Sequence, residues 1–530
     1  MTPGQASRSP ALTYVEARAA GIDGNSARSA ALFAELARQS KDPVLRRTAI
    51  SSAIDAGRND LALQLMAGLP TTDLSIDARL LRVADSLRRG RIRDAIMVVE
   101  TPDPKVSIAF LGPLLRAWER AGHRDVSAAL AALDAAPDNG VLAPFRDQER
   151  ALILLKLGHP DAAAEIAKRV GGGVRDRRLR FVLADGLWRL GKREQALAII
   201  DAMGLEGAAA KARLQAGKGL DQSIGNEAEA FSDLLTALAT GFGRSEQREI
   251  PINLLRAAQA ADPRNASAAI LVGYVLADLR RYDDALAAYR TVQAADVLAS
   301  DARSTEVAVL EEAGRRSEAV ALARSQAARP DAGANDYRSL AQILAASEQH
   351  AEAAEMFARA IALAGPQTAA GDLWPLYLGR ASALLDAGRW PESRAVLGAA
   401  LTIAPAEPLL LNFLGYSKLE RGEDLDGAEA MIRKASALAP DNGSIIDSLG
   451  WALFKRGKTE EAIDLLRKAA LSAPAESEIH EHLGDALYSA GRRYEARFAW
   501  SAALITAEAE RRARLKAKLD GGLSAATAAP

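Results

Sequence analysis

The chain has 530 residues, too many for one compact core, so it forms either several domains or an elongated array. Hydrophobic residues make up 49%, aromatic residues only 5% and charged residues 25%, a composition typical of a soluble helical protein. The balance of 67 Lys and Arg against 68 Asp and Glu argues against a nucleic-acid partner, which requires a broad positive surface. The lack of cysteine excludes disulfides, thiol catalysis and Cys-ligated zinc.

The N-terminus leaves the cellular compartment open. No stretch approaches the ~18 uninterrupted apolar residues of a transmembrane helix, and the opening MTPGQASRSP lacks the basic and apolar regions of a signal peptide. The segment does resemble the flexible start of a mature chain whose signal peptide has been removed. We therefore expect residues 1–10 to be disordered. The chain is expected in the periplasm, with outer-membrane association left open, and the cytoplasm is the alternative.

An internal repeat organises the chain. Three pairs of small residues stand 34 positions apart: Gly450 and Gly484, Gly457 and Gly491, Ala462 and Ala496. The first position recurs upstream at Gly415, Ala381, Ala341, Val307 and Gly273. Apolar residues at i, i+3, i+4 and i+7, then a turn glycine and a second periodic run, predict two helices per unit. The small Gly450 and Ala462 predict a close crossing of these helices.

The repeat predicts an all-α, α-solenoid superhelix of about 13–14 helix-turn-helix units with a C-terminal capping helix. Turn glycines recur at a similar spacing in the N-terminal third, although the pattern there is degenerate. The expected segments are degenerate repeats over 11–203, an irregular joint over 204–228, a well-matched array over 229–503, a capping helix over 504–520 and a disordered tail over 521–530. The basic end of the cap suits a helix C-terminus; contact with an anionic surface is the alternative.

The units resemble tetratricopeptide repeats. The residues that carry the resemblance in one unit are Leu449, Gly450, Ala462, Leu466, Ala469 and Pro474. The resemblance implies that the first helix of each unit lines the concave side of a superhelix, where a protein or peptide partner binds.

Catalytic motifs are missing from the sequence. No GxSxG and no HExxH occurs, and the glycine-rich segments 170–175 and 241–243 carry neither GKS nor GKT. Five His in 530 residues leave little general-base chemistry. The sequence therefore predicts a protein that is not an enzyme and has no cofactor, no metal site and no catalytic residue.

A stripe on the first helices is the predicted partner-binding site. Residues spaced i, i+4 and i+7 share one face of a helix, and aromatic anchors are typical of binding hot spots. The predicted site comprises Tyr274, Asn412, Tyr416, Asp447, Trp451, Phe454, Glu481, Asp485 and Tyr488. For Trp451 two interpretations stay open: it faces the groove, or it packs against Tyr416 and Tyr488 and holds neighbouring repeats together.

The last three units also resemble a group of long bacterial tetratricopeptide proteins that includes outer-membrane lipoproteins. That resemblance implies a periplasmic adaptor that holds a C-terminal processing protease, although this chain has no lipid-bearing cysteine. The leading hypothesis is a non-catalytic scaffold in the bacterial envelope. The alternative is a cytoplasmic sensor that binds a peptide or protein segment to control secretion or signalling. The sequence leaves the oligomeric state open.

Overall fold

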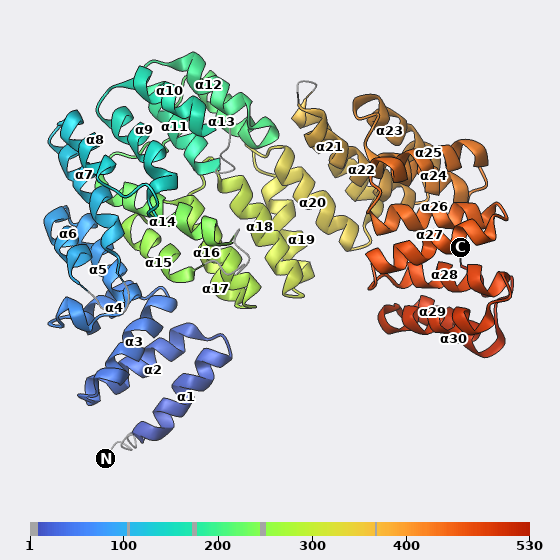
Figure 1. Cartoon of the computed structure of the whole chain (residues 1–530), viewed down its shortest axis with the longest axis horizontal. Helices are drawn as coiled ribbons and strands as arrows, with labels where there is room; N and C mark the ends of the chain where they lie inside the picture. Colours follow the sequence, from blue (N-terminus) through green and yellow to red (C-terminus); the bar gives the residue numbers. More distant parts are fainter. Residues whose placement is uncertain (1–8, 103–106, 172–176, 244–250, 366–367, 530) are drawn as a thin grey trace. The chain divides into compact units, whose positions relative to one another are not determined.

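The structure is a computed structural model that describes residues 9–102, 107–171, 177–243, 251–365 and 368–529 (Figure 1). Its described residues are helical, turn or irregular, with no strand among them. The chain divides into two compact units, an N-terminal unit (Met1–Ile343) and a C-terminal unit (Leu344–Pro530). Among the described helices, none combines the length and the apolar character needed to cross a bilayer.

The N-terminal unit consists of antiparallel helix pairs. Its helices are α1 (Pro10–Ile22), α2 (Ser26–Gln39), α3 (Pro43–Asp55), α4 (Asn59–Met66), α5 (Ile76–Arg88), α6 (Ile92–Glu100), α7 (Gly112–Gly122), α8 (Val126–Asp134), α9 (Arg146–Lys156), α10 (Pro160–Gly171), α11 (Arg177–Arg189), α12 (Arg193–Asp201), α13 (Ala208–Gln215), α14 (Glu227–Gly243), α15 (Ile252–Ala261), α16 (Ala266–Asp278), α17 (Tyr282–Tyr289), α18 (Ala299–Glu312) and α19 (Arg316–Ala327). Short 3-10 turns are η1 (Thr71–Asp73), η2 (Ala109–Leu111), η3 (Ala143–Phe145) and η4 (Gly204–Gly207).

The C-terminal unit continues the pattern. Its helices are α21 (His350–Ala364), α22 (Ala370–Asp386), α23 (Trp390–Ile403), α24 (Pro408–Glu420), α25 (Leu425–Leu438), α26 (Gly443–Lys455), α27 (Thr459–Ser472), α28 (Ser477–Ser489), α29 (Arg493–Thr506) and α30 (Ala509–Gly521), while α20 (Ala334–Ala346) contains the boundary between the units. We call the first helix of each pair helix A and the second helix B. The prediction of an all-α chain of repeated helix pairs is confirmed.

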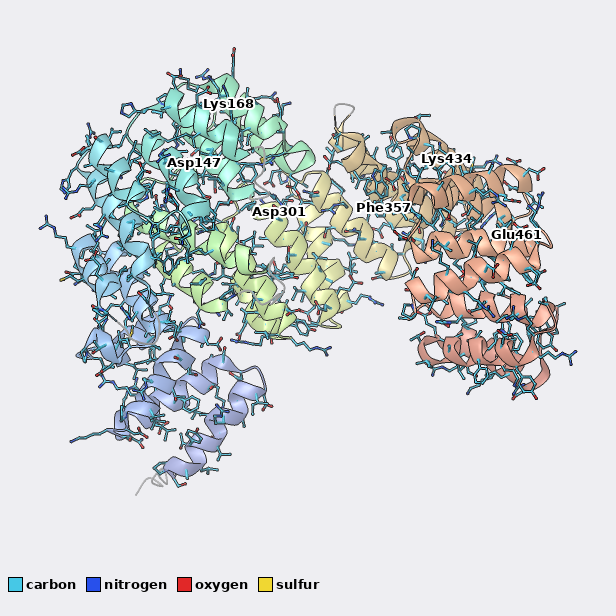
Figure 2. All side chains as sticks on the ribbon, in the orientation of Figure 1. Asp147, Lys168, Asp301, Phe357, Lys434 and Glu461 are labelled. Atoms are coloured by element: carbon cyan, nitrogen blue, oxygen red, sulfur yellow. The ribbon has the colours of Figure 1, made fainter. Side chains whose placement is uncertain are left out.

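The turns and crossings in the C-terminal unit have the local causes that the sequence suggests. Gly457 ends a helix with a φ of 75°, a conformation that side-chain-bearing residues rarely adopt. A Cβ added to Gly450 would lie 2.8 Å from Cγ of Leu466 and 3.3 Å from the carbonyl oxygen of Ala462. The predicted close crossing of α26 and α27 is therefore confirmed. In the same way a Cβ added to Gly379 of α22 would lie 2.5 Å from Cζ of Phe357 on α21; Phe357 is marked in Figure 2.

The interior of the N-terminal unit is filled by its own chain. All ten residues of 230–239 in α14 are buried, and a helix that is buried on every side needs packing partners all round. Those partners include α5 and α7, while α15 packs against α3 and α5 (Figure 1). The earlier repeats thus curl back onto α14 and α15. This corrects the expectation of a concave wall left open for a partner, because here the wall is occupied by helices of the same unit.

Hydrogen bonds and ion pairs in this unit join segments that are distant in the sequence. Arg281 donates to both carboxylate oxygens of Asp55, at 3.0 and 2.9 Å. Arg256 donates to the Asp55 carbonyl oxygen at 3.0 Å, and the Ser26 hydroxyl donates to Asp284 at 2.8 Å. These contacts hold α2 and α3 against α15 and α17. The packing of the first repeats against these later helices is therefore defined by specific polar contacts.

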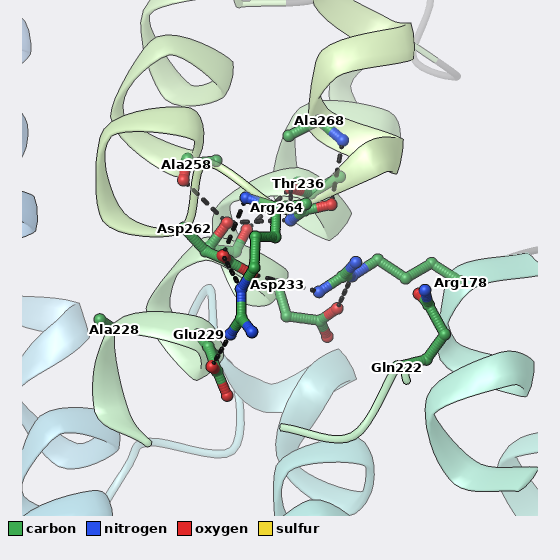
Figure 3. Close-up of polar contacts among 12 residues, drawn as sticks. Arg178, Gln222, Ala228, Glu229, Asp233, Thr236, Ala258, Asp262, Arg264 and Ala268 are labelled. Carbon is green, nitrogen blue, oxygen red and sulfur yellow. Dashed lines mark hydrogen bonds and ion pairs between the residues drawn. The ribbon is translucent and has the colours of Figure 1, made fainter. Parts of the chain in front are cut away.

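A polar cluster accompanies α14 into the interior (Figure 3). Buried Asp233 accepts hydrogen bonds from Nε of Arg178 at 2.7 Å and from Gln148 at 2.9 Å. Asn265 donates to the hydroxyls of Ser232 and Thr236, at 2.9 and 3.1 Å. Because buried polar groups are costly unless hydrogen-bonded, this network fixes the position of α14 among its neighbours.

The predicted joint over 204–228 contains η4, α13 and a loop, and it lies inside the N-terminal unit. The buried carboxylate of Asp185 accepts hydrogen bonds from the backbone N–H groups of Leu220, Gln222 and Ser223, at 2.7, 3.0 and 3.0 Å. The loop is thereby fixed to α11. The division between the compact units falls instead at residue 343. Of the predicted disordered segment 1–10, residues 1–8 lie outside the described residues, and Pro10 begins α1.

Glu149 gives a pH prediction for the N-terminal unit. Its buried carboxyl accepts a hydrogen bond from Nε1 of Trp118 at 3.1 Å, and its other oxygen has no hydrogen-bond partner in the described part of the chain. Burial, followed by the charge of Asp233, raises the pKa of Glu149 to about 8. Because the pKa of Glu149 is higher in the folded state than in the unfolded state, its protonated carboxyl is compatible with folding at low pH. The free energy of unfolding then falls as the pH rises above the ordinary carboxyl pKa toward and through 8. Glu149→Gln should remove this loss.

We expect wild type to lose about 2–4 kcal/mol relative to Glu149→Gln between pH 5 and pH 8, since each pKa unit corresponds to about 1.4 kcal/mol. Denaturant unfolding of both proteins at these two pH values measures the difference. Parallel pH profiles for the two proteins would contradict a protonated Glu149.

Candidate functional site

The predicted stripe lies along the A helices of the C-terminal unit, where it forms a ladder between successive repeats. Asn412 of α24 donates to Ser448 of α26 at 3.1 Å. One repeat further, Asp447 of α26 accepts from Nδ1 of His482 on α28 at 3.0 Å. The next step joins Glu481 of α28 to α30. Stripe residues on these A helices therefore reach across to the following A helix or to the cap.

Trp451 packs between repeats. Its ring stacks on the imidazole of His482, with centroids 4.0 Å apart and an interplanar angle of 10°, and it also stacks on Phe454 at 5.0 Å. Only 1% of Trp451 is exposed. Of the two interpretations, an open groove-facing anchor does not fit the structure, whereas packing between repeats does. The ring that it meets on the neighbouring A helix is His482. Tyr416 and Tyr488, which the sequence suggested, pack against the same apolar cluster.

His482 is held in a buried, acidic environment. Its Nδ1 faces both oxygens of Asp447, and its Nε2, which has no hydrogen-bond partner among the described residues, lies 3.9 Å from Glu478. Burial by itself lowers the pKa of His482, but the charge and hydrogen bond of Asp447 outweigh it, so the net pKa is raised. The imidazole therefore carries positive charge toward higher pH than an ordinary histidine and partly neutralises the carboxylates around it.

The last two acidic positions of the stripe are occupied by the C-terminal helix. Lys518 of α30 is fully buried and donates to Glu481 at 2.6 Å and to both oxygens of Asp485 at 2.8 Å. Arg514 forms a bidentate pair with Glu481, at 2.8 Å for each contact. Burial raises the pKa of Glu481, yet Arg514 and Lys518 outweigh this effect and lower it overall. Glu481 and Asp485 thus hold the chain's own cap.

The described residues after α30, 522–529, are also packed, which differs from the predicted disordered tail over 521–530; residue 530 lies outside the described residues. The backbone N–H of Ala529 donates to Asp485 at 2.9 Å, and Ala529 is buried. A Cβ on Gly522 would lie 2.2 Å from the Tyr488 hydroxyl oxygen. The buried carboxylate of Asp485 therefore holds the tail against α28 as well as the cap.

One part of the ladder remains accessible and acidic. We call it the acidic face and define it by Tyr416, Glu420 and Glu478, on α24 and α28. The Tyr416 hydroxyl is hydrogen-bonded to Glu420. Burial, followed by the charge of Glu478, raises the pKa of both Tyr416 and Glu420. Arg511 of α30 lies 3.3 Å from Glu478 and compensates part of the negative charge of the two carboxylates. The remaining negative charge favours a cationic ligand.

The structure separates the predicted site residues into three groups. Asp447, Trp451, Glu481 and Asp485 are buried between helices. Asn412, Tyr416, Phe454 and Tyr488 are half-buried on the A helices. Tyr274 is exposed but belongs to the N-terminal unit. The sequence pattern did not identify the basic partners Arg514 and Lys518, although each follows the acidic residue that it contacts by about one repeat length.

Comparison with known proteins identifies the repeat. The family model of the tetratricopeptide repeat matches residues 236–297 and 448–514, so the chain carries tetratricopeptide repeats in both units. A TPR repeat-containing protein of Pseudomonas aeruginosa is 38% identical over 58 residues, which cover 11% of this chain and 10% of that protein. The chain thus matches about a tenth of the length of this curated relative. Repeats of this kind form scaffolds for protein–protein interaction.

Solved structures with similar folds have low overall similarity. A chain of the APC/C hetero-tetramer Cut9–Hcn1 gives a TM-score of 0.40 at 14% identity, over 98% of this chain and 97% of that chain. Yeast Tom70 gives 0.32 at 12% identity, over 97% and 95%. MamA gives 0.26 at 22% identity, over 35% and 99%. Similarity at this level does not assign a partner.

The packing of Trp451 generates a stability prediction. Trp451→Ala should destabilise the C-terminal unit by about 3–5 kcal/mol, as is typical for large-to-small changes in a core, because it removes the ring stacked on His482 and Phe454. A groove-facing Trp451 would instead leave unfolding nearly unchanged. Thermal or denaturant unfolding measures the effect, with the exposed Tyr274→Ala as the control at about 0.5 kcal/mol or less. Equal stability of both variants would contradict the buried stack.

Proposed function

We propose that the C-terminal unit binds a partner polypeptide whose Lys or Arg side chains contact the acidic face. The observation that carries the proposal is the convergence of Glu420, Glu478 and the Tyr416 hydroxyl, with burial and mutual repulsion raising the pKa of Glu420. A partner cation would relieve this repulsion. The half-buried Tyr416 ring adds an apolar surface of the kind found in binding hot spots.

The chain itself gives an example of the chemistry that this ladder accepts. One and two turns along α28 from Glu478, the carboxylates of Glu481 and Asp485 are satisfied by the basic side chains of α30. Arg511 reaches Glu478 at 3.3 Å and Glu481 at 3.2 Å. A bound segment with arginine or lysine at helical spacing would repeat this pattern on α24 and α28.

We further propose that the partner is a protein of the bacterial envelope, with a C-terminal processing protease as the first candidate. Support for this finer proposal is the resemblance of the last three repeats to envelope adaptors. A cytoplasmic sensor that controls secretion or signalling is the alternative. Fractionation of source cells that express the chain from its native start codon distinguishes them: recovery in the periplasm or outer membrane supports the envelope, and recovery in the cytosol supports the sensor.

Charge reversal tests the acidic face. The double variant Glu420→Lys and Glu478→Lys should lose at least tenfold in affinity for the partner captured by wild type, because attraction to a cation becomes repulsion and like-charge contacts cost several kcal/mol. Affinity capture from source cells with mass spectrometry identifies the partner, and a titration with that purified partner measures the affinity. Raised salt should weaken wild-type binding, since exposed charges are screened.

The matched control is the double variant Glu460→Lys and Glu461→Lys. It makes the same change in net charge on helix B of the same unit, where both side chains are exposed and Glu461 is marked in Figure 2. Binding that survives in this control and fails in the acidic-face variant supports the proposal. Equal retention by both variants, with unchanged unfolding temperatures, would refute the acidic face as the binding surface.

A further inference from the structure

The outer surface of α29 carries large apolar side chains that nothing in the described structure covers. Tyr494 is 85% exposed, Phe498 76% and Ile505 79%. Their spacing of i, i+4 and i+11 places them in one line along the helix, with exposed Ser501 completing it at i+7. We call these four residues the α29 ridge. Contiguous exposed apolar surface of this kind marks an interaction site in a soluble protein.

The preceding repeat does not carry the ridge. At the equivalent positions one repeat earlier, Tyr494 is replaced by Glu460, Phe498 by Asp464 and Ser501 by Arg467. Only Ile505 has an apolar counterpart, Leu471, which is itself 83% exposed. The helix-B fold therefore accepts charged residues at these positions, and the aromatic residues of α29 are not required for packing within the repeat.

The ridge is complementary to a second copy of itself. If two α29 helices lie antiparallel around a two-fold axis midway between residues 499 and 500, Tyr494 faces Ile505 of the partner subunit. Phe498 then faces Ser501 of the partner subunit, so a large ring meets a small side chain at both central positions. The spacing of 4, 3 and 4 residues is that of the a and d core positions of a coiled coil. In this antiparallel register each a position faces a d position of the partner subunit.

Charges beside the ridge do not oppose this pairing. Glu495 is already paired with Arg492 at 2.7 Å. In the antiparallel register Glu495 and Arg497 lie on the same sides of the seam as the apolar Ala502 and Leu504 of the partner subunit, respectively. No like charges are brought together, which a two-fold interface requires because each patch meets itself.

The area of the ridge is of the right order for such a contact. Two aromatic side chains bury about 300–500 Å² per copy, and Ile505, Leu471 and the stems of the flanking arginines add to this. A standard interface buries about 800 Å² per partner. We propose that two copies of this chain associate as a two-fold dimer through their α29 ridges. The contact lies on helix B and is independent of the acidic face on the A helices.

Sedimentation analysis of the full chain tests the dimer. Wild type should be dimeric at micromolar concentration, and Phe498→Glu should be monomeric while it unfolds at the same temperature as dilute, dissociated wild type. The control is Leu438→Glu, which places a charge at another exposed apolar residue of the same unit and should leave the dimer intact. A wild-type monomer, or a dimer that persists in Phe498→Glu, would overturn the proposal.

Cross-linking through introduced cysteines tests the register. Because the chain has no native cysteine, any disulfide or thiol cross-link must form between the introduced residues. Ser501→Cys lies near the two-fold axis, about 4–5 Å along the helix from its symmetry mate, so mild oxidation or a short thiol cross-linker should join two chains. Thr506→Cys, about 20 Å from its mate along the helix, should stay uncross-linked. Cross-linking of Thr506→Cys alone would reject this register. A wild-type monomer that floats with neutral phosphatidylcholine vesicles would instead assign the ridge to membranes and reject the dimer.

Discussion

A pair of short helices cannot bury its own apolar faces, so each pair must pack them against other helices. The rest of this structure depends on which helices do so. Inside the array the neighbouring pair supplies the cover, and glycines such as Gly450 let the helices approach closely. In the N-terminal unit the cover comes from further along the chain. There α14, with ten consecutive buried residues, fills the space inside the earlier repeats, and the unit gains one continuous core.

Buried ion pairs attach the last helix, α30, to α28. Lys518 is fully buried against Glu481 and Asp485. Such a buried ion pair adds little stability compared with apolar packing, whereas loss of one partner is strongly destabilising. The ionic contact therefore specifies one position for α30. The same carboxylate of Asp485 also accepts from Trp500 at 2.9 Å and from Ala529, so helix B, the cap and the tail all meet at one buried group.

These closures determine which surfaces remain for recognition. The N-terminal unit uses its inner wall for its own helices, and the cap covers the last acidic positions of the ladder. Glu420 is exposed and Glu478, which Arg511 of the cap contacts at 3.3 Å, is half-exposed, so the acidic face on α24 and α28 leaves carboxylates for the basic segment proposed above. The α29 ridge presents apolar side chains on a helix B. Because the two surfaces belong to different helices of the repeat, binding of a partner and pairing of two copies need not compete.

Sequence periodicity and tertiary packing decided different things. The repeat spacing, the turn glycines and the small residues at helix crossings are local requirements, and the helix pairs and the close contact at Gly450 follow from them. Contacts such as that between Asp55 and Arg281, 226 residues apart, depend instead on how the accumulated rotation of the repeats brings them together. In the same way Asp447, Trp451 and Asp485 lie on the A helices, as the repeat predicts. Each residue along a helix is rotated by about 100° from the one before it, so the repeat also predicts which of them share a face, but it does not predict what that face contacts. The sequence by itself determined which residues share a helical face. Only the tertiary structure decided that Trp451 meets His482 and that Asp485 meets Lys518, because the angle between successive repeats is set by their packing and no single repeat contains it.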